Sequence, residues 1–337
     1  MLVGLVLSLV LAVGHGAVSI AAEAQLRMLL QAIGLGAGAA VDPLQHTVFF
    51  AIRLPRALLA VLVGGALAVC GASLQGLFRN PLADPGLIGV STGAALAAAF
   101  AIVLGGTLAP ALALSLSAWL LPLAAFVGGL GATALVFIIA SRSGICDVPT
   151  MLLAGVAVNA IAGAAIGLLV FLSDDAQLRE LSFWMLGSLS GITWTRLLPA
   201  LPLLLVPTVL LLRLGHPLNA LLLGEQDAGH LGVRVERVKR SAILLVSLAV
   251  GAAVALTGVI GFVGLVVPHL VRLLLGPDHR VLLPASALAG AALLLLADVL
   301  ARTLVLPAEL PIGILTSCVG GPFFLWLLCR PREPGRL

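Results

Sequence analysis

The sequence predicts an all-α integral membrane protein, and three observations favour this fold class. Hydrophobic residues make up 61% of the 337 positions, and charged residues make up only 9%. A soluble domain carries about 25% charged residues, which it needs to cover its core with polar surface. The apolar runs are also long and continuous, which indicates helices and not the alternating short strands of a membrane β-barrel. Composition therefore argues against a soluble enzyme, a nucleic-acid-binding protein and a disordered chain.

Ten segments approach the length of about 20 apolar residues that a helix needs to cross the hydrocarbon layer. In order along the chain they are residues 1–22, 54–76, 86–105, 118–140, 150–172, 192–213, 241–260, 262–275, 281–301 and 311–329. The first has no basic residues before its apolar run, which favours an uncleaved span over a signal peptide. The eighth is the shortest and contains Pro268, His269 and Arg272. We expect ten transmembrane helices within a single domain that covers residues 1–337.

The basic residues indicate how these spans are oriented. With the N-terminus inside, twelve of the 18 lysine and arginine residues fall on the cytoplasmic side of the predicted spans. Lysine and arginine accumulate in cytoplasmic loops, so both termini are expected in the cytoplasm.

The longest polar insertion on that side is residues 214–240, whose charged residues follow a helical, amphipathic pattern. Gly224 and Gly232 permit tight turns at the two ends of a short helix. Glu225, near its start, has the charge that a helix N-terminus favours. Two interpretations remain open: a solvated loop, or a structured docking element for a cytoplasmic partner.

The sequence argues against catalysis by this chain. Its one lysine, Lys239, is not part of a GxxxxGK[ST] motif, so the chain lacks the P-loop that binds nucleotide phosphates. Residues 89–93 match GxSxG, but a nucleophile elbow follows a strand, whereas this motif opens an apolar helix. No HExxH motif and no paired Cys/His spacing is present. We therefore expect no catalytic residue, no metal site and no cofactor on this chain.

Small residues recur every four positions along the fifth span, at Gly155, Asn159, Gly163 and Gly167. This spacing is typical of tight helix packing through small residues. It also suits the smooth wall of a translocation path with one polar group, because a polar side chain in the membrane needs a partner or water. Both interpretations remain open.

Asp298 and Arg302 lie four residues apart near the end of the ninth span. An ionisable residue within a span is a functional candidate. A pair at this spacing also neutralises itself on one helix face, and spacing alone does not decide between these interpretations.

Six stretches together resemble the membrane permeases of the iron-chelate, haem and vitamin B12 class of ABC importers, the FecCD-type family. They occur in the family's order and spacing from about residue 50 to the end, at residues 53–56, 75–86, 261–269, 276–280, 297–302 and 309–313. The resemblance implies a type II importer permease fold in the bacterial inner membrane, as a homodimer surrounded by lipid. It also implies two copies of a separate cytoplasmic ATPase, which bind ATP and Mg²⁺, and one periplasmic substrate-binding protein.

The same resemblance implies roles for individual residues. Three arginines match basic positions that meet acidic residues of the binding protein: Arg53, Arg56 and Arg302. Five residues lie in a stretch that resembles the segment coupled to the ATPase: Gly224, Glu225, Ala228, Leu231 and Gly232. Four residues match the cytoplasmic gate or lie on the fifth span, which lines the path in this family: Asn80, Leu82, Gly155 and Asn159. A second gate position usually carries small hydroxyl residues, and residues 147–150 do not match it.

Residues 78–89 and 183–189 most resemble the haem-importing branch of the family. Ferric-siderophore and cobalamin permeases share nearly all of these residues, so both remain alternatives to haem as the substrate. A secondary transporter is less favoured, because such proteins place ionisable groups near the middle of the bilayer and nearly every charge here lies at a span end or in a loop.

Overall fold

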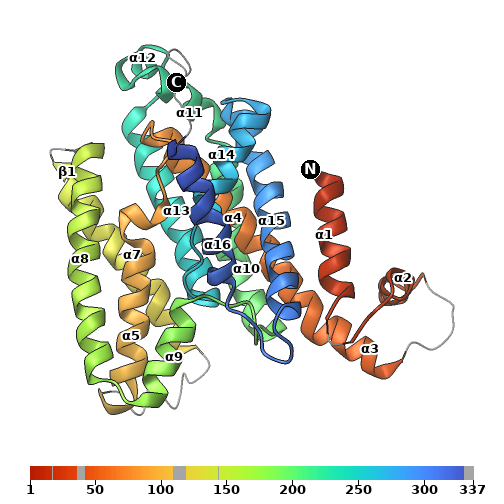
Figure 1. The fold of residues 1–337 in the computed structure, drawn as a ribbon. Coiled ribbons are helices and arrows are strands. Elements are labelled where there is room, and N and C mark those ends of the chain that lie inside the picture. Colours follow the sequence, from red (N-terminus) through yellow and green to blue (C-terminus); the bar gives the residue numbers. More distant parts are fainter. Residues whose placement is uncertain (17, 36–41, 109–118, 143, 330–337) are drawn as a thin grey trace.

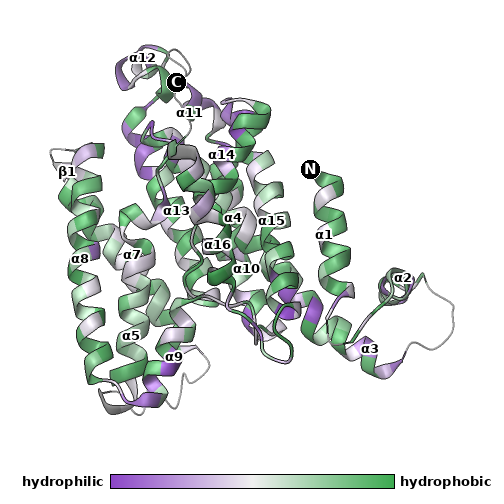
Figure 2. Ribbon diagram, viewed as in Figure 1, coloured by the Kyte–Doolittle hydropathy of each residue, from purple (hydrophilic) through white to green (hydrophobic). Residues whose placement is uncertain are grey.

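The computed structural model describes residues 1–16, 18–35, 42–108, 119–142 and 144–329, and within these ranges the chain is almost entirely helical (Figure 1). Six helices are long and apolar enough to cross a membrane, and four shorter apolar helices accompany them. These ten helices correspond one to one to the ten expected spans. Apolar residues fill the middle of the molecule, and hydrophilic residues gather towards its two ends (Figure 2). The chain is a multi-pass membrane protein.

The α-helices are α1 (Leu2–Gly14), α2 (Ala22–Ala32), α3 (Pro43–Thr47), α4 (Leu54–Leu77), α5 (Val90–Leu108), α7 (Leu120–Ala140), α8 (Val148–Leu172), α9 (Asp175–Met185), α10 (Trp194–Leu212), α11 (Gly215–Leu223), α12 (Glu225–His230), α13 (Val235–Thr257), α14 (Val263–Leu275), α15 (His279–Thr303) and α16 (Ile312–Cys329). A π-helical segment, η1 (Val48–Arg53), joins α3 to α4, and a 3₁₀ turn, η2 (Pro85–Ile88), precedes α5. Two short antiparallel strands, β1 (Ser141–Arg142) and β2 (Ile145–Cys146), form a hairpin directly before α8.

Helix α4 is the centre of the bundle, in contact with α10, α13, α14 and α15. In the apolar stretch of the span that contains α4, 83% of the residues are buried within the molecule, whereas in that of α8 only 22% are buried. Glycines allow this close packing, since a Cβ atom at Gly71 would lie 1.6 Å from the carbonyl oxygen of Gly264. A Cβ atom at Gly64 would lie 2.3 Å from the carbonyl oxygen of Gly290. Small residues thus bring α14 and α15 into backbone contact with α4.

The expected first span, residues 1–22, is wrong in its length, because α1 ends at Gly14. The last carbonyl groups of a helix lack partners within it. Here Arg53 donates to the carbonyl oxygens of Val13 (2.7 Å) and Gly14 (2.9 Å), and Arg302 donates to that of Ala12 (2.8 Å). Two arginines from distant segments therefore cap α1, and the chain then turns into α2, which the sequence analysis did not predict.

The remaining spans lie close to the expected ranges, including the short eighth one, which forms α14. Helix α9 was not expected, although its start carries a recognisable signal. The Asp174 carboxylate accepts from the backbone N–H of Gln177 (2.8 Å), and the Gln177 side chain accepts from that of Asp174 (3.1 Å). This reciprocal pair is a capping box, which fixes the helix N-terminus.

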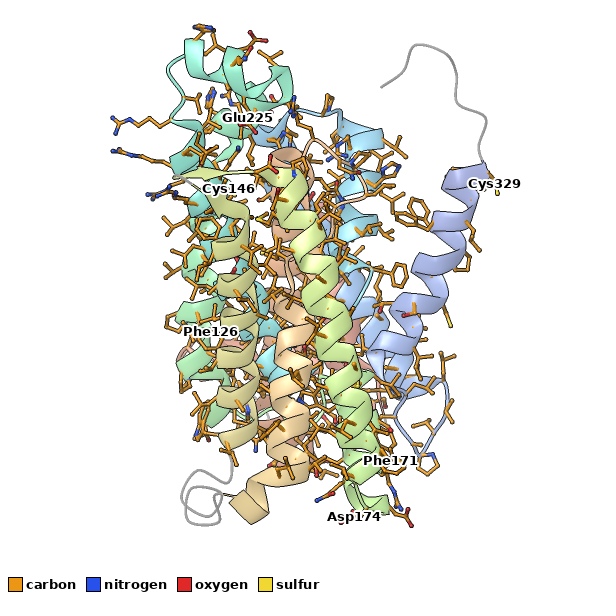
Figure 3. The ribbon with its side chains drawn as sticks, turned by 90° about the vertical axis from the view of Figure 1, so that its left-hand side faces the viewer. Phe126, Cys146, Phe171, Asp174, Glu225 and Cys329 are labelled. Carbon is orange, nitrogen blue, oxygen red and sulfur yellow. The ribbon has the colours of Figure 1, made fainter. Side chains whose placement is uncertain are left out.

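The molecule has two ends, which we name the α12 end and the α9 end after the short helices found there (Figure 1). Helix α1 begins towards the α12 end, and α16 reaches Cys329 at the same end, with Asp174 at the opposite one (Figures 1 and 3). The beginning and the end of the described chain therefore lie on one side of the bundle.

Candidate functional site

Residues 214–240, at the α12 end, form two short helices and the first turn of α13. Helix α12 is bounded by Gly224 and Gly232, whose φ angles of 126° and 83° lie in the region that favours glycine. The carbonyl oxygen of Gly224 accepts from the backbone N–H of Ala228 (3.0 Å) and closes the first turn. The segment is thus an ordered helical element and not a solvated loop.

The expected coupling residues divide between the inside and the outside of this element. Ala228 is fully buried, whereas Leu231 is 64% exposed. Leu223, in the last position of α11, is 65% exposed and Leu222 is also exposed. Apolar side chains at an otherwise polar end of the molecule are suited to contact a partner. Leu231, and not Ala228, therefore offers a surface for docking.

Lys239 lies beneath this element and is 2% exposed. Its Nζ donates to Glu225 Oε2 of α12 (2.7 Å), to Glu236 Oε1 of α13 (3.3 Å) and to the carbonyl oxygen of Cys146 in β2 (2.8 Å). The other carboxylate oxygen of Glu236 accepts from the backbone N–H of Cys146 (2.9 Å). A buried ammonium group needs this complete set of acceptors, since an unpaired charge there is costly. This cluster was not predicted, although a single lysine beside an apolar span was a signal for it.

The segment between α4 and α5 carries two of the expected gate residues. Arg79 has a φ of 49°, and the backbone N–H of Asn80 donates to the carbonyl oxygen of Gln75 (3.1 Å), which ends α4 in a Schellman-type turn. The Asn80 side chain then accepts from the backbone N–H of Leu82 (2.9 Å). Leu82 is 41% exposed. Asn80 therefore fixes the turn, and Leu82 is left on the surface.

The two residues expected along the translocation path, Gly155 and Asn159, lie on α8 and contact the continuation of the same segment. A Cβ atom at Gly155 would lie 1.8 Å from the carbonyl oxygen of Leu87, so no larger side chain fits there. The Asn159 Nδ2 donates to the carbonyl oxygen of Gly86 (3.1 Å), while its buried Oδ1 has no hydrogen-bond partner among the described residues. All four residues thus lie in, or contact, residues 80–87.

The structure separates the glycine pattern of α8 into two parts. Gly155 serves tight packing, as one of the two interpretations expected. Gly163 and Gly167 have open space where a Cβ atom would lie, and both are exposed. The far half of α8 therefore keeps an open, smooth face.

Two carboxylates at helix N-termini connect neighbouring segments at the α12 end. Hydrogen bonds from the Thr150 side chain and backbone lower the pKa of Asp147, which caps α8. Hydrogen bonds from the Asn219 amide (2.6 Å) and from the backbone N–H of Arg280 (2.9 Å) lower the pKa of Asp278, which caps α15. Residues 147–150, which do not match the family's second gate position, form the start of α8. Asn219 connects α11 to the start of α15.

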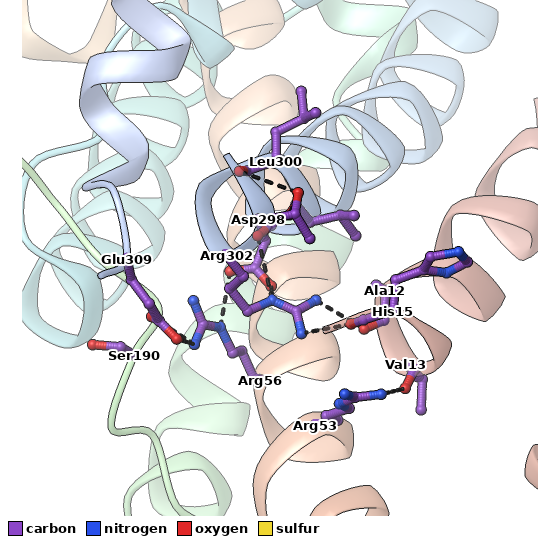
Figure 4. Close-up of polar contacts among 12 residues, drawn as sticks. Ala12, Val13, His15, Arg53, Arg56, Ser190, Asp298, Leu300, Arg302 and Glu309 are labelled. Carbon is purple, nitrogen blue, oxygen red and sulfur yellow. Dashed lines mark hydrogen bonds and ion pairs between the residues drawn. The ribbon is translucent and has the colours of Figure 1, made fainter. Parts of the chain in front are cut away.

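The three arginines expected to dock a partner gather at the α9 end, but their guanidinium groups are turned inward (Figure 4). Arg53 and Arg56 are 5% and 7% exposed. Arg56 pairs with Asp298 (2.9 Å) and with Glu309 (3.0 Å), and Arg302 pairs with the second oxygen of Asp298 (3.0 Å). The i,i+4 pair expected at Asp298 and Arg302 is formed, whereas the additional pairs of Arg56 with Asp298 and Glu309 were not predicted. The docking role of the three arginines stays a prediction.

The comparisons with known proteins agree with this architecture. The model of the FecCD transport family matches residues 4–330. The chain is 53% identical over 292 residues to the hemin transport system permease protein HmuU of Yersinia pestis. The matched region covers 87% of this chain and 86% of that protein. It is 46% identical over 282 residues to the cobalamin import system permease protein BtuC of Halobacterium salinarum, which covers 84% and 73%. A solved inward-facing structure of a metal-chelate type ABC transporter superposes with a TM-score of 0.82 at 36% identity, over 97% of this chain and 96% of that one.

Proposed function

The chain belongs to the FecCD transport family as a permease subunit of an ABC importer, and we propose that the substrate it moves across the membrane is haem. The chain is not an enzyme, because ATP hydrolysis in such an importer takes place on a separate subunit. One observation carries the choice of haem: the hemin permease is more similar to this chain than the cobalamin permease is, over a slightly larger share of it.

We further propose that the working unit contains two copies of this chain in the bacterial inner membrane, with the α12 end in the cytoplasm. Helix α8 supports the dimer, because it is little buried within one copy. Its exposed residues include Leu153 (72%), Ile161 (70%) and Phe171 (84%), next to the open positions Gly163 and Gly167. An apolar helix face with small residues suits close packing against a second helix in a membrane.

The ATPase is expected to bind the α12 end, with one copy on each permease. Leu222, Leu223 and Leu231 provide exposed apolar contacts there, and Gly224, Glu225, Ala228 and Gly232 hold α12 in place. ATP and Mg²⁺ would be bound by that partner and not by this chain. A binding protein is expected at the α9 end, near Arg53, Arg56 and Arg302.

The translocation path is expected to follow α8 towards residues 80–87. Gly155 and Asn159 join α8 to η2, and Asn80 and Leu82 lie in the turn that precedes η2. A movement of α8 relative to α4 would therefore change the position of Leu82, the exposed member of the four. This arrangement is suited to a gate that opens when the two helices shift.

Cobalamin and a ferric siderophore are the second candidates for the substrate, each favoured by one observation. The cobalamin permease of Halobacterium salinarum is a relative at nearly the same level of identity. The solved structure with the high TM-score is a metal-chelate type transporter.

Transport by the reconstituted complex tests these proposals. The permease, its ATPase and its binding protein are reconstituted in proteoliposomes with ATP inside, and the uptake of hemin, cobalamin and a ferric siderophore is measured. We expect hemin uptake that requires ATP and the binding protein and survives collapse of the proton gradient. Uptake of cobalamin or the siderophore without hemin would overturn the choice of haem. Uptake that stops with the proton gradient and ignores ATP would indicate a secondary transporter.

A further inference from the structure

We propose that Lys239 is a positioning residue that joins the ATPase-facing helix α12 to α8, so that the two move together during transport. This inference rests on the proposed function, because it assumes that α12 receives the movement of the ATPase. It goes further in assigning the connection to one side chain and its three acceptors.

The first contact of Lys239 is with the coupling helix itself. Its Nζ lies 2.7 Å from Oε2 of Glu225, the first residue of α12. The Glu225 side chain is 42% exposed, whereas that of Lys239 is 3% exposed. The salt bridge therefore runs from a partner-facing helix into the interior of the bundle.

The second contact is with the hairpin that leads into α8. Lys239 donates to the carbonyl oxygen of Cys146, and Glu236 accepts from the backbone N–H of the same residue. Both backbone polar groups of Cys146 are thus held by side chains of α13. Cys146 is followed directly by Asp147, the N-cap of α8, and consecutive Cα atoms stay about 3.8 Å apart. A displacement of Cys146 must therefore displace the start of α8. Figure 3 shows Glu225 and Cys146 at the same end of the molecule.

A third set of contacts joins α8 to the segment that carries the expected gate residues. Gly155 packs on the carbonyl oxygen of Leu87, and Asn159 donates to that of Gly86. A continuous set of contacts therefore runs from Glu225 through Lys239, Cys146 and α8 to η2. Because Lys239 is excluded from water, a lost hydrogen bond there leaves a buried charge short of a partner, which favours keeping its three contacts together. Contiguous packed and hydrogen-bonded contacts of this kind can carry coupling between sites.

Arg240 provides a matched control in the neighbouring position of α13. Its Nη2 donates to the carbonyl oxygen of Gly144 in the same hairpin (2.6 Å). Within the described part of the chain, its side-chain hydrogen bond is with the hairpin and does not reach α12. Removal of the Arg240 side chain therefore takes away one hairpin contact and leaves the contacts of Lys239 and Glu236 with Cys146 in place.

The experiment compares Lys239→Met, Glu225→Ala, the double variant and Arg240→Met in the reconstituted complex with ATPase and binding protein. The main measurement is the number of substrate molecules transported per ATP hydrolysed. We expect Lys239→Met and Glu225→Ala each to lower this ratio about fivefold or more, while the ATPase still co-purifies with the permease. The double variant should be no worse than either single one, since both changes remove the same link. Arg240→Met should stay within twofold of the wild type.

A spin-label distance supplies a readout that a purely structural role would not change. Labels at Gln226→Cys and Ile145→Cys, both exposed, are placed in a background with Cys318 and Cys329 replaced by serine. The wild type and Arg240→Met should give one narrow distance with and without ATP. Lys239→Met should give a broad distribution that changes with ATP.

Two outcomes overturn the inference. One is an unchanged transport ratio in both Lys239→Met and Glu225→Ala, and the other is an equal loss in Arg240→Met. If Lys239→Met fails to fold, Glu225→Ala decides the matter alone, since its partly exposed side chain is not needed to fill the interior. A wild-type complex whose ATPase does not respond to the loaded binding protein would instead contradict the proposed function, independently of these variants.

Discussion

Asp298 is 1% exposed and lies between two guanidinium groups, each of which binds a different oxygen of its carboxylate. The same two arginines reach outward from this pair, Arg56 to Glu309 and Arg302 to the end of α1. One carboxylate thus joins three separate parts of the chain. Its removal leaves two buried positive charges close together.

We expect Asp298→Asn to lower the free energy of unfolding by about 3 kcal/mol, because a broken buried ion pair leaves its partners uncompensated. Glu309 still neutralises Arg56 in part, which keeps the loss at the lower end of the usual range. The measurement is unfolding of the purified protein in detergent micelles. The control is Glu23→Gln, whose partner Arg27 is 54% exposed on the surface of α2, and it should change stability by less than about 0.5 kcal/mol. Equal stability of the two variants would show that the Asp298 cluster is not a structural element.

At the scale of the helix, the two halves of α8 have opposite requirements for side-chain volume. Gly155 touches the backbone of η2, while Gly163 meets nothing within 4 Å. The two glycines lie on the same helix, two turns apart. They therefore separate the effect of packing from that of helix propensity.

We expect Gly155→Ala to destabilise the protein by about 1–3 kcal/mol, because its methyl group would overlap the carbonyl oxygen of Leu87. Within a single chain, Gly163→Ala should be neutral or slightly stabilising, since its methyl group meets nothing within 4 Å and alanine favours a helix by up to about 1 kcal/mol over glycine. Thermal unfolding of both variants in the same detergent provides the comparison. If Gly155→Ala matched Gly163→Ala, α8 and η2 would not be in close contact.

Helix α12 allows a similar separation of folding from binding. Leu231→Glu changes an exposed side chain and should keep the stability of the wild type while weakening ATPase binding about tenfold or more, as loss of an apolar contact residue does. Ala228→Glu places a carboxylate where Ala228 is 0% exposed, so it should disturb α12 and reduce stability as well. Co-purification of the ATPase and thermal unfolding distinguish the two. Normal ATPase binding by Leu231→Glu would show that the ATPase does not contact the permease at this helix.

At the scale of the whole molecule, the two ends differ in what they offer to partners. The α12 end presents the exposed side chains of Leu222, Leu223 and Leu231, and the α9 end contains a network of arginines and carboxylates. The beginning and the end of the described chain lie on the same side of the bundle as α12. The orientation itself leads to a direct test.

We expect Gln226→Cys to react with a membrane-impermeant maleimide only after the inner membrane is opened. Asp174→Cys should react in cells whose outer barrier alone has been permeabilised. Both positions are exposed; Gln226 lies in α12, and Asp174 lies at the opposite end of the bundle (Figures 1 and 3). The labelling is carried out in a background with the exposed cysteines Cys318 and Cys329 replaced. The reverse pattern would place α12 outside the cytoplasm.

The hydrophobic pattern was sufficient to predict the ten spans, because the length of an apolar run is a local property that the bilayer imposes. Two local signals were overlooked: the capping box at Asp174, and the Gly14–Gly16 stretch at which α1 ends. Other features were not accessible from local patterns. Arg53 caps a helix that lies 39 residues earlier, and Arg56 pairs with a carboxylate 242 residues away. Such partners depend on how the helices pack, and local sequence patterns do not reveal that arrangement.

Lys239 also gives the molecule one lysine amine whose chemical reactivity depends on whether the junction between α12 and the hairpin is open. It carries the only side-chain amine in the sequence, and that amine is bonded to three acceptors and shielded from solvent. An amine-reactive acylating reagent can modify it only when the junction opens, in the way that amide hydrogens exchange only from open states. The rate of acylation at this one position, followed by mass spectrometry of the intact native chain, therefore reports how often α12 separates from the hairpin at each stage of the transport cycle.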